Sequence, residues 1–391
     1  MIKKVLFKIS GALLRAHRYL DWRLKMGSGF KPRVVRYPDE RGTKKIVHVI
    51  GNFIVGGSSQ LVVDIIEGTS DEYLHKIVVP YTEEQLAYQP VDIRAFSIAE
   101  LRDLSTWLAN EKPEFVHIHY FVRPGDKHSD GALWYETVFK ICEDLGLKVI
   151  QNVNVPTHPN PSPAVVHNVF VSEYVRREFN NVETESSVIY PGSDFSHFQN
   201  DDIDRLPDKS IGMVYRLDND KLRPDAIEVF IEAVKKDPAI KGHIVGGGQL
   251  LDDFKRRVRD EGLESNISFA GFVSYDDLPA IYRRFSIFVA PVHDESFGQV
   301  TPFAMGMGMC VAGYDTGAMS EILGSCETLV PSGSVRPLAD LIVEIANDPP
   351  RRKSIGSFNK QRATESFTVE QMVRDYRTLF NTMSADSVKE T

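Results

Sequence analysis

The sequence predicts an α/β protein built from two consecutive doubly wound domains. Short apolar runs alternate with amphipathic segments along most of the chain, and this alternation restarts after a joint rich in Pro, Gly and Asp at residues 190–209. Strands that alternate with helices form parallel sheets covered on both faces. The chain has 391 residues, of which 42% are hydrophobic and 26% charged, so each domain can bury its own core.

The first series of elements opens with an apolar run at 46–50, a glycine-containing loop at 51–60 and a helical segment at 61–68. A strand, a glycine loop and a helix in this order are how a Rossmann-like domain begins. Periodicity predicts the remaining elements of this series, which are strands at 75–80, 115–119, 149–153 and 169–172 and helices at 99–110, 131–145 and 173–179.

The second series begins near residue 210. Its strands are expected at 211–215, 242–245, 267–269, 287–290 and 310–312, and its helices at 225–236, 250–261 and 276–285. The two Rossmann-like domains therefore span residues 44–190 and 191–366. A last helix is expected at 368–383.

Residues 1–30 precede both domains and are expected to form a basic amphipathic helix. Seven Lys and Arg residues accompany the single acid Asp21 within residues 1–25, and the apolar residues share the opposite face of a helical wheel. This profile is typical of a helix lying in an anionic membrane surface. The alternative is an extra helix packed on the first domain. Since no run of eighteen uncharged apolar residues exists, we expect a cytoplasmic protein that is peripheral on the cytoplasmic face of the membrane.

Charge and metal-ligand spacing disfavour two other classes of protein. The net charge of −8 argues against a general nucleic-acid binder. The three cysteines, Cys142, Cys310 and Cys326, lack metal-ligand spacing, and the 11 histidines form no ligand-spaced cluster with carboxylates along the sequence. We therefore expect neither a nucleic-acid partner nor a metal site.

The most informative segment is 291–323, PVHDESFGQVTPFAMGMGMCVAGYDTGAMSEIL. It resembles the donor-sugar site of the retaining family-4 glycosyltransferases, on nine residues that match their motif: Glu295, Ser296, Phe297, Gly298, Ala304, Met305, Gly317, Glu321 and Ile322. Phe303 stands where this family has a second glutamate, which usually accepts hydrogen bonds from the nucleotide ribose.

Other segments resemble the same family in the same order. Arg216 and Lys221, five apart after a strand, are similar to its diphosphate-binding signature, and a solvated loop is the alternative reading. The glycines of 243–250 and the strand end 269–274 match two further turns, and 186–198 resembles the interdomain hinge. In the first domain, 117–119 (HIH) resembles a His-x-His motif whose histidine contacts the transferred sugar, and Gly56 and Gly57 lie in the expected glycine loop, where a plain strand-to-helix turn is equally compatible.

The resemblance implies the GT-B fold, in which two Rossmann-like domains face each other across a cleft and the C-terminal helix, here within 367–391, crosses back to the first domain. It also implies a site, whose expected catalytic residues are His119, Arg216, Lys221 and Glu295. Its expected donor-binding residues are Gly56, Gly57, Gly246, Gly248, Gly271, Phe272, Val273, Ser296, Phe297, Gly298, Gln299, Val300, Gly317 and Glu321.

The implied activity is metal-independent, retaining transfer of a hexose or deoxyhexose from a nucleoside-diphosphate sugar to a saccharide or lipid-linked acceptor, in polysaccharide or glycolipid biosynthesis. No cofactor is expected. A nucleotide-sugar 2-epimerase of the same fold and a non-catalytic partner of a true transferase are the alternatives. Phe303 has three explanations: a ribose held by Glu321 or by the backbone near Thr316 and Gly317, a deoxyribose nucleotide such as dTDP, or loss of donor binding.

Overall fold

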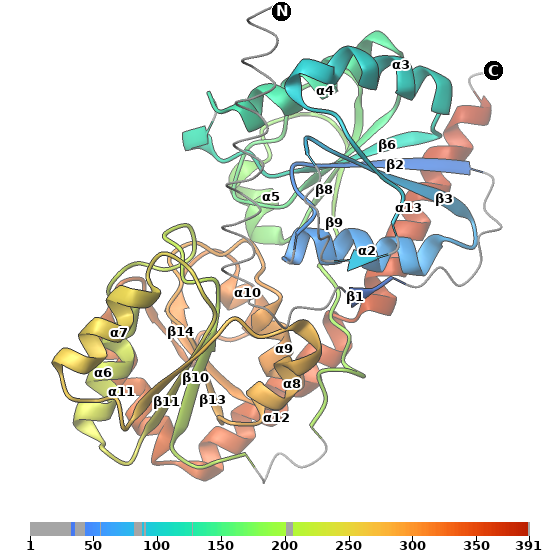
Figure 1. Cartoon of the computed structure of the whole chain (residues 1–391). Helices are drawn as coiled ribbons and strands as arrows, with labels where there is room; N and C mark the ends of the chain where they lie inside the picture. The colour runs from blue at the N-terminus through green and yellow to red at the C-terminus, as the bar shows by residue number, and fades with distance from the viewer. Residues whose placement is uncertain are drawn as a thin grey trace, which may run out of the picture.

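The computed structural model describes residues 33–35, 44–54, 56–81, 88–89, 91–126, 128–200 and 206–389. The predicted N-terminal helix and its membrane contact lie outside these residues. The described chain forms two parallel sheets, each covered by helices on both faces, stacked end to end (Figure 1). The predicted α/β architecture with two doubly wound domains is confirmed.

The first sheet has seven strands in the order β5-β3-β2-β6-β7-β8-β9, and every pair is parallel. Its strands are β2 (Lys44–Ile50), β3 (Tyr73–Val79), β5 (Ile93–Ala95), β6 (Phe115–Tyr120), β7 (Val149–Val153), β8 (Val165–Phe170) and β9 (Ser186–Val188). A separate two-residue pair joins β1 (Arg33–Val34) to β4 (Tyr88–Gln89). The strand order reverses between β2 and β6, and at such a point open α/β sheets bind their ligands.

Two layers of helices cover the first sheet (Figure 1). The strand residues Val47, Val116 and Ile118 face α3 (Leu101–Glu111) and α4 (Asp130–Asp144). The opposite face, with Ile46 and Phe115, packs against α2 (Gly57–Thr69) and the C-terminal helix α13 (Val369–Lys389). The short helix α5 (Glu173–Phe179) follows β8 and begins at Ser172, whose hydroxyl accepts a hydrogen bond from the Val175 N–H.

The second sheet has six parallel strands in the order β12-β11-β10-β13-β14-β15, which is the Rossmann order 3-2-1-4-5-6. The strands are β10 (Ser210–Val214), β11 (Lys241–Val245), β12 (Ile267–Gly271), β13 (Ile287–Ala290), β14 (Cys310–Asp315) and β15 (Leu329–Pro331). The helices are α6 (Ala226–Lys236), α7 (Leu251–Asp260), α8 (Leu278–Tyr282), α9 (Val300–Gly306), α10 (Met319–Leu323), α11 (Val335–Ala346) and α12 (Pro349–Ser366). In Figure 1, α6, α7 and α11 lie on one side of this sheet and α8, α9 and α12 on the other.

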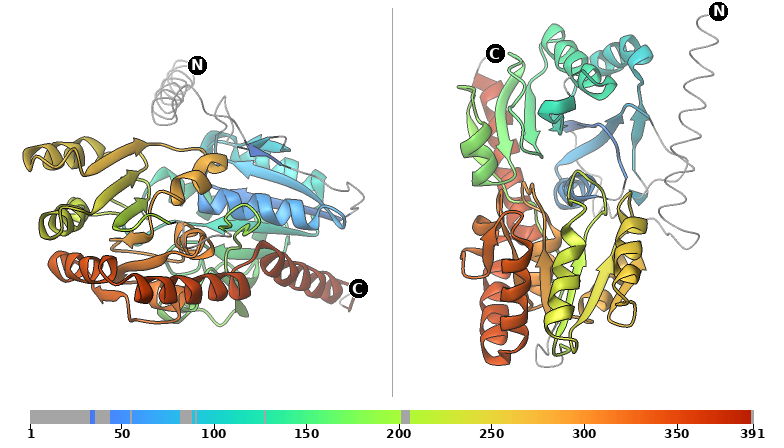
Figure 2. Two further views of the ribbon diagram at one scale, coloured as in Figure 1. Left: turned by 90° about the horizontal axis from the view of Figure 1, so that it is seen from below. Right: turned by 90° about the vertical axis from the view of Figure 1, so that its left-hand side faces the viewer.

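The last helix ties the domains together. Figure 2 shows α12 and α13 running in succession from the second domain to the first. Three apolar residues of α13, Met372, Tyr376 and Phe380, are fully buried in the first domain's core. Gly192 must be glycine because a Cβ there would overlap the backbone of Val369 at the start of α13. The structure thus places α13 on the first domain although it follows the second in sequence.

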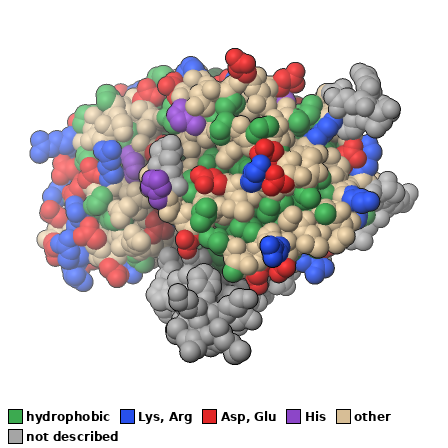
Figure 3. All heavy atoms as spheres, turned by 90° about the horizontal axis from the view of Figure 1, so that it is seen from above, with side chains coloured by type: hydrophobic (Ala, Val, Ile, Leu, Met, Phe, Trp, Pro, Cys, Tyr) green, Lys and Arg blue, Asp and Glu red, His purple; other side chains and the backbone are tan. Residues whose placement is uncertain are grey.

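Basic and acidic side chains are interspersed on the face drawn in Figure 3. Among the described residues, the helices are all too short or too polar to cross a membrane.

Candidate functional site

The carboxyl ends of the two sheets meet at the domain junction. In the second domain, the loops after β10 and β13 lie side by side because these strands are neighbours at the point where the strand order reverses. The first of these loops carries Arg216 and Lys221, and the second carries Glu295. The sheet topology therefore brings together three predicted catalytic residues that are far apart in sequence.

Lys221 and Glu295 form an ion pair with 2.8 Å between Nζ and Oε1. The Glu295 side chain is only 1% exposed, whereas that of Lys221 is 24% exposed. The second carboxylate oxygen of Glu295, Oε2, is buried and has no hydrogen-bond partner among the described residues. A buried carboxylate oxygen without a donor is costly, so this atom is suited to accept hydrogen bonds from a ligand hydroxyl.

Two glycines with positive φ shape the backbone around Glu295. Gly298 has φ 65°, and a Cβ there would overlap the Glu295 carboxylate. Gly317 has φ 57°, and its Cβ would overlap the carbonyl of Glu295, which accepts a hydrogen bond from the Ala318 N–H at 2.9 Å. Both predicted donor-binding glycines therefore hold Glu295 in place by allowing close backbone contact.

Arg216 lies near this pair but has other partners. Its side chain is 59% exposed, and its guanidinium contacts Asp218 at 3.4 Å and Asp220 at 2.7 Å. Burial by itself raises the pKa of the Asp220 carboxyl, but the charges of Arg216, Arg123 and Lys221 outweigh it and leave that pKa below its usual value. Asp220 is therefore an anion surrounded by cations.

The turn after β11 supports the loop that carries Arg216. Gly246 and Gly248 have φ values of 128° and 150°. A Cβ on Gly246 would overlap the carbonyl of Tyr215, and a Cβ on Gly248 would overlap that of Leu217. Gly271, at the end of β12 with φ 68°, accepts a hydrogen bond from the Gly246 N–H at 2.8 Å, and Phe272 and Val273 follow it. These glycines allow three neighbouring turns to pack together.

The residues that follow Glu295 contact the domain junction. The Ser296 hydroxyl donates to the carbonyl of Asn154 in the first domain at 3.0 Å, and Gln299 Nε2 donates to the Gly192 carbonyl at 2.9 Å. Phe297 is buried and its ring stacks on that of Tyr190, with 5.6 Å between centroids. Val300 starts α9. These side chains link the loop that follows β13 to the first domain and to the hinge segment.

The first-domain glycine loop faces the same junction. Helix α2 begins at Gly57, and Gly56 precedes it without a side-chain cap. A Cβ on Gly57 would lie 3.2 Å from the side-chain oxygen of Gln299, so the amino end of α2 is next to the second domain. The uncapped N–H groups at a helix start favour anions.

Glu321, a predicted donor-binding residue, has its carboxylate engaged with the first domain in this structure. Its two carboxylate oxygens accept hydrogen bonds from the backbone N–H groups of Glu173 at 2.7 Å and Tyr174 at 2.8 Å, at the start of α5 in the first domain. The Arg362 guanidinium holds the carbonyls of Glu321 and Ile322 from behind. In this structure, Glu321 caps a helix of the other domain, and both its oxygens are engaged.

Phe303 lies in an aromatic cluster. Its ring is parallel to that of Phe198, with 3.9 Å between centroids and 4° between planes, and Tyr275 meets it edge-on. The side chain is 5% exposed. The position where the resembling family has a carboxylate is thus filled by apolar packing against the hinge segment.

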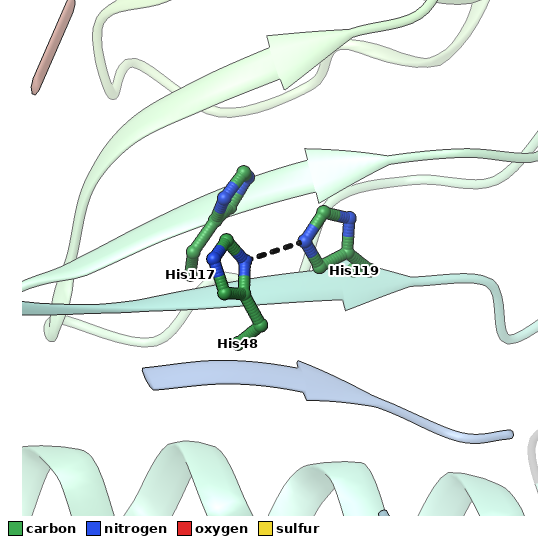
Figure 4. A group of neighbouring side chains, drawn as sticks. All are labelled: His48, His117 and His119. Atoms are coloured by element: carbon green, nitrogen blue, oxygen red, sulfur yellow. Dashed lines mark hydrogen bonds between the residues drawn. The ribbon is translucent and has the colours of Figure 1, made fainter. Parts of the chain in front are cut away.

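The first domain contains a buried histidine cluster that the sequence only partly indicated. His119 and His117 on β6 and His48 on β2 lie together on one face of the sheet (Figure 4). His75 on β3 lies on the same face, which α2 and α13 cover. Burial first, and then the neighbouring histidines, lower the pKa of His48 and His119 well below the usual value. Burial also lowers the pKa of His75 and of His117 to about 3. All four imidazoles are therefore neutral at pH 7.

One hydrogen-bond chain fixes the tautomers of three of these histidines. The Thr69 hydroxyl donates to the Ile65 carbonyl at 2.7 Å, so it accepts from His75 Nε2 at 3.1 Å. His75 Nδ1 then accepts from His48 Nε2 at 2.9 Å, and His48 Nδ1 accepts from His119 Nε2 at 3.3 Å. Within the described part of the chain, the buried Nδ1 atom of His119 has no hydrogen-bond partner. His119 is thus oriented by the other histidines.

The same cluster is the group best suited to a metal among the residues that the structure describes. The ligand atoms of His48, His117 and His119 lie within 4.8 Å of one another. Two observations argue against a bound ion. The first is that all three side chains are neutral and fully buried, so the group offers no carboxylate to balance the charge of a divalent ion. The second is that the hydrogen-bond chain already uses the facing lone pair of His48. The observed geometry therefore favours a hydrogen-bonded network over a metal centre.

With this geometry established, comparison with known proteins identifies the class. Residues 199–362 match the family model of glycosyl transferases group 1. This range contains Arg216, Lys221, Glu295 and the glycine turns around them. The second domain is therefore a glycosyl transferases group 1 domain, as the motif resemblance predicted; the assignment to the retaining family 4 remains a prediction.

The chain is also similar to individual glycosyltransferases. It is 30% identical over 135 residues to the lipopolysaccharide core biosynthesis mannosyltransferase LpsB of Rhizobium meliloti, which covers 34% of this chain and 38% of that protein. It is 24% identical over 204 residues to the poly(ribitol-phosphate) alpha-N-acetylglucosaminyltransferase of Staphylococcus aureus, covering 51% of this chain and 40% of that protein. The matched region thus spans well under half the length of these relatives.

Solved structures extend the likeness to both domains. Anabaena Alr3699/HepE in complex with UDP and glucose superposes with a TM-score of 0.69 at 16% identity, covering 87% of this chain and 100% of that one. The sucrose-phosphate synthase of Thermosynechococcus elongatus superposes with a TM-score of 0.71 at 16% identity, covering 88% and 100%. These superpositions confirm the predicted GT-B fold.

Proposed function

We propose that this protein is a retaining glycosyltransferase that moves a hexose or deoxyhexose from a nucleoside-diphosphate sugar to a hydroxyl of a saccharide or lipid-linked acceptor. The observation that carries the proposal is the buried Lys221–Glu295 pair with its unpartnered carboxylate oxygen. It lies at the strand-order reversal of a glycosyl transferases group 1 domain. Such an edge is where open α/β sheets bind nucleotides.

The residues of this edge can perform the transfer by positioning and by electrostatic stabilisation. Glu295 Oε2 would accept hydrogen bonds from sugar hydroxyls and fix the sugar for attack. Lys221 and Arg216 would offset the negative charge that grows on the leaving diphosphate. The amino end of α2 would face the same anion from the first domain. The acceptor hydroxyl attacks from the face that the diphosphate leaves, and the diphosphate takes its proton.

The transfer needs no metal in this proposal, because cations of the chain supply the charge that the leaving group requires. The identity of the donor nucleotide is the part of the proposal that the site residues constrain least. Phe303 is packed against Phe198 and offers no acceptor, and Glu321 is engaged with α5, so neither side chain supports recognition of a ribose diol in this conformation. The explanations that remain are backbone groups near Gly317, a deoxyribose donor such as dTDP-sugar, and loss of donor binding.

The acceptor is proposed from the relatives and from the N-terminal sequence. Relatives named for lipopolysaccharide core synthesis and for O-antigen chain synthesis support an acceptor in cell-surface polysaccharide or glycolipid assembly. The basic amphipathic segment 1–25 would bring such a protein to an anionic membrane on its cytoplasmic face.

The proposal is tested by screening UDP-, GDP- and dTDP-sugars for turnover by the purified full-length protein, with and without a membrane-extracted acceptor pool. We expect one nucleotide class to give acceptor-dependent transfer with retained anomeric configuration. Lys221→Ala should lower this turnover by about 10²-fold or more. Lys235→Ala should leave it unchanged, because Lys235 lies on α6 and pairs with Glu261. Epimerised nucleotide sugar formed without acceptor would instead identify a 2-epimerase, and binding of none of the donors would identify a non-catalytic protein.

A further inference from the structure

An arginine of the first domain reaches across the junction to the predicted diphosphate site. Arg123 lies in the loop after β6, next to the strand-order reversal of the first sheet. Its Nη1 donates to the Asp220 carbonyl at 3.3 Å, and its Nη2 is 3.6 Å from Asp220 Oδ2. The side chain is 29% exposed. Sequence reasoning missed it because nothing in the local pattern separates it from other loop arginines.

The anion that Arg123 contacts is shared with the predicted catalytic cation Arg216. Arg216 Nη2 binds Asp220 Oδ2 at 2.7 Å, so two guanidiniums from different domains hold one carboxylate oxygen. The other oxygen, Oδ1, is buried without a hydrogen-bond partner among the described residues. The two arginines therefore share one oxygen of Asp220, and the carboxylate itself is only partly satisfied.

The neighbouring residue His293 is also surrounded by cationic side chains. His293 precedes Glu295 by two residues, and its buried Nδ1 has no hydrogen-bond partner among the residues that the structure describes. Its pKa is lowered first by burial and then by Arg223, with Arg123 and Lys221 adding to the effect, although Asp294 opposes it. Three cations from two domains therefore act on this part of the junction.

We propose that Arg123 is a donor-binding residue and that Asp220 occupies the diphosphate position in the ligand-free protein. This inference rests on the proposed function and adds a first-domain residue to it. A diphosphate carries more charge and more acceptor oxygens than one carboxylate, and guanidinium groups bind phosphate with paired hydrogen bonds. The incoming diphosphate displaces the Asp220 carboxylate from Arg123 and Arg216.

This exchange links donor binding to the domain arrangement. Arg123 belongs to the first domain and Arg216 to the second, so an anion held by both fixes the two sheet edges relative to each other. Asp220 makes the same bridge in the absence of donor. The junction is thereby kept close to its binding geometry, which lowers the ordering cost of donor binding.

The test is calorimetric titration of the full-length protein with inorganic pyrophosphate, UDP, GDP and dTDP. Arg123→Ala should weaken pyrophosphate and the preferred nucleotide by about tenfold or more, the size expected for a hydrogen bond to a charged group. Arg123→Lys should recover only part of this loss, because it keeps the charge and loses the paired geometry. Asp220→Asn should tighten binding several-fold, because it removes the competing anion.

Arg257 supplies the matched control. Its side chain is 32% exposed and it pairs with Glu228 and Asp253 on the second domain, away from the junction. Arg257→Ala should leave all four affinities unchanged, and thermal unfolding of each variant reports whether the fold is intact.

The outcomes separate this inference from the proposed function. If Arg123→Ala binds pyrophosphate and nucleotides as the wild type does, or if Asp220→Asn binds them more weakly, Arg123 is only an interdomain link and the inference is wrong. If Arg123 controls pyrophosphate affinity but no nucleotide sugar is turned over, the anion site stands and the proposed function fails. A wild-type protein that does not bind pyrophosphate at all also overturns the inference.

Discussion

The two domains share one topology and use it differently at the edge where ligands bind. In the second domain, charged side chains on two adjacent loops come together around the buried carboxylate of Glu295. In the first domain, the strands beside the reversal point carry neutral histidines that are sealed beneath α2 and α13. We therefore expect the chemistry in the second domain. The first domain has a core of buried, hydrogen-bonded histidines and extends single residues such as Arg123 to the junction.

The largest effect should come from the second domain's cation. Lys221→Ala removes the partner of a buried carboxylate and the charge that offsets the leaving diphosphate, so we expect turnover to fall by about 10²-fold or more. The measurement is kcat with the preferred sugar nucleotide. Since Lys221→Arg keeps the charge, it should retain more activity than the alanine variant; equal activity of all three proteins would remove Lys221 from the chemistry.

Lowering the pH should reduce the stability of the first domain more than that of the second. The four buried histidines have folded-state pKa values below the unfolded value, so the unfolded chain binds more protons as the pH falls. Their stabilisation is complete above about pH 6.5 and is lost progressively as the pH falls below it. For His75 and His117, whose folded-state pKa is about 3, the loss is about 2 kcal/mol each at pH 5.

This prediction is checked by urea unfolding between pH 7.5 and pH 5, with fluorescence and hydrogen exchange to locate the domain that opens first. His75→Gln should flatten the pH dependence, because one titrating group is removed while a hydrogen-bonding side chain remains. A second domain that opens before the first as the pH falls would contradict the contrast between the two cores.

The sequence predicted some secondary-structure elements accurately and missed others. Alternation predicted the sheets well, and the strands at 149–153 and 287–290 match the structure to the residue. The edge strands β5, β9 and β15 were not predicted, because three residues are too short to show a period. Helices α11 and α12, which are 12 and 18 residues long, were also not predicted.

Some residues of the candidate site could be predicted from the sequence and others could not. Arg216, Lys221 and Glu295 could be predicted, because each lies in a short local motif. The contacts Arg123–Asp220 and Glu321–α5 join segments of different domains, so no local pattern contains them. The histidine network lies between these cases: His48 pairs in register with His117, and the known order of neighbouring strands would have placed both on one face. His75 could have been added by the same argument.

A smaller effect is expected where the aromatic cluster replaces a carboxylate. Phe303→Glu places a charge against Phe198 at a site that is 5% exposed, so the free energy of unfolding should fall by about 2–4 kcal/mol. Chemical unfolding measures this loss, and Phe303→Leu separates the lost stacking from the buried charge. An unchanged stability would show that this position opens to solvent or to a ribose, and improved UDP affinity in the same variant would favour a ribose site.

The smallest effect concerns the contact between the domains. Glu321→Ala leaves two N–H groups of α5 without their acceptor, which should cost about 1 kcal/mol, the usual value of a helix cap. Glu321→Gln keeps one good acceptor and should lose less. Small-angle scattering would show whether the domains separate; if the alanine variant is as stable and as compact as the wild type, the contact contributes nothing to the junction.

The central claim is that Glu295 binds the sugar that is transferred. The most direct measurement compares Glu295→Gln with the wild type for affinity to the preferred nucleoside diphosphate and for turnover of the corresponding nucleotide sugar. The amide can still accept from Lys221, so we expect nucleotide affinity to stay within about threefold while turnover falls by about 10²-fold. Undiminished turnover in a protein that binds the nucleotide normally would contradict this account.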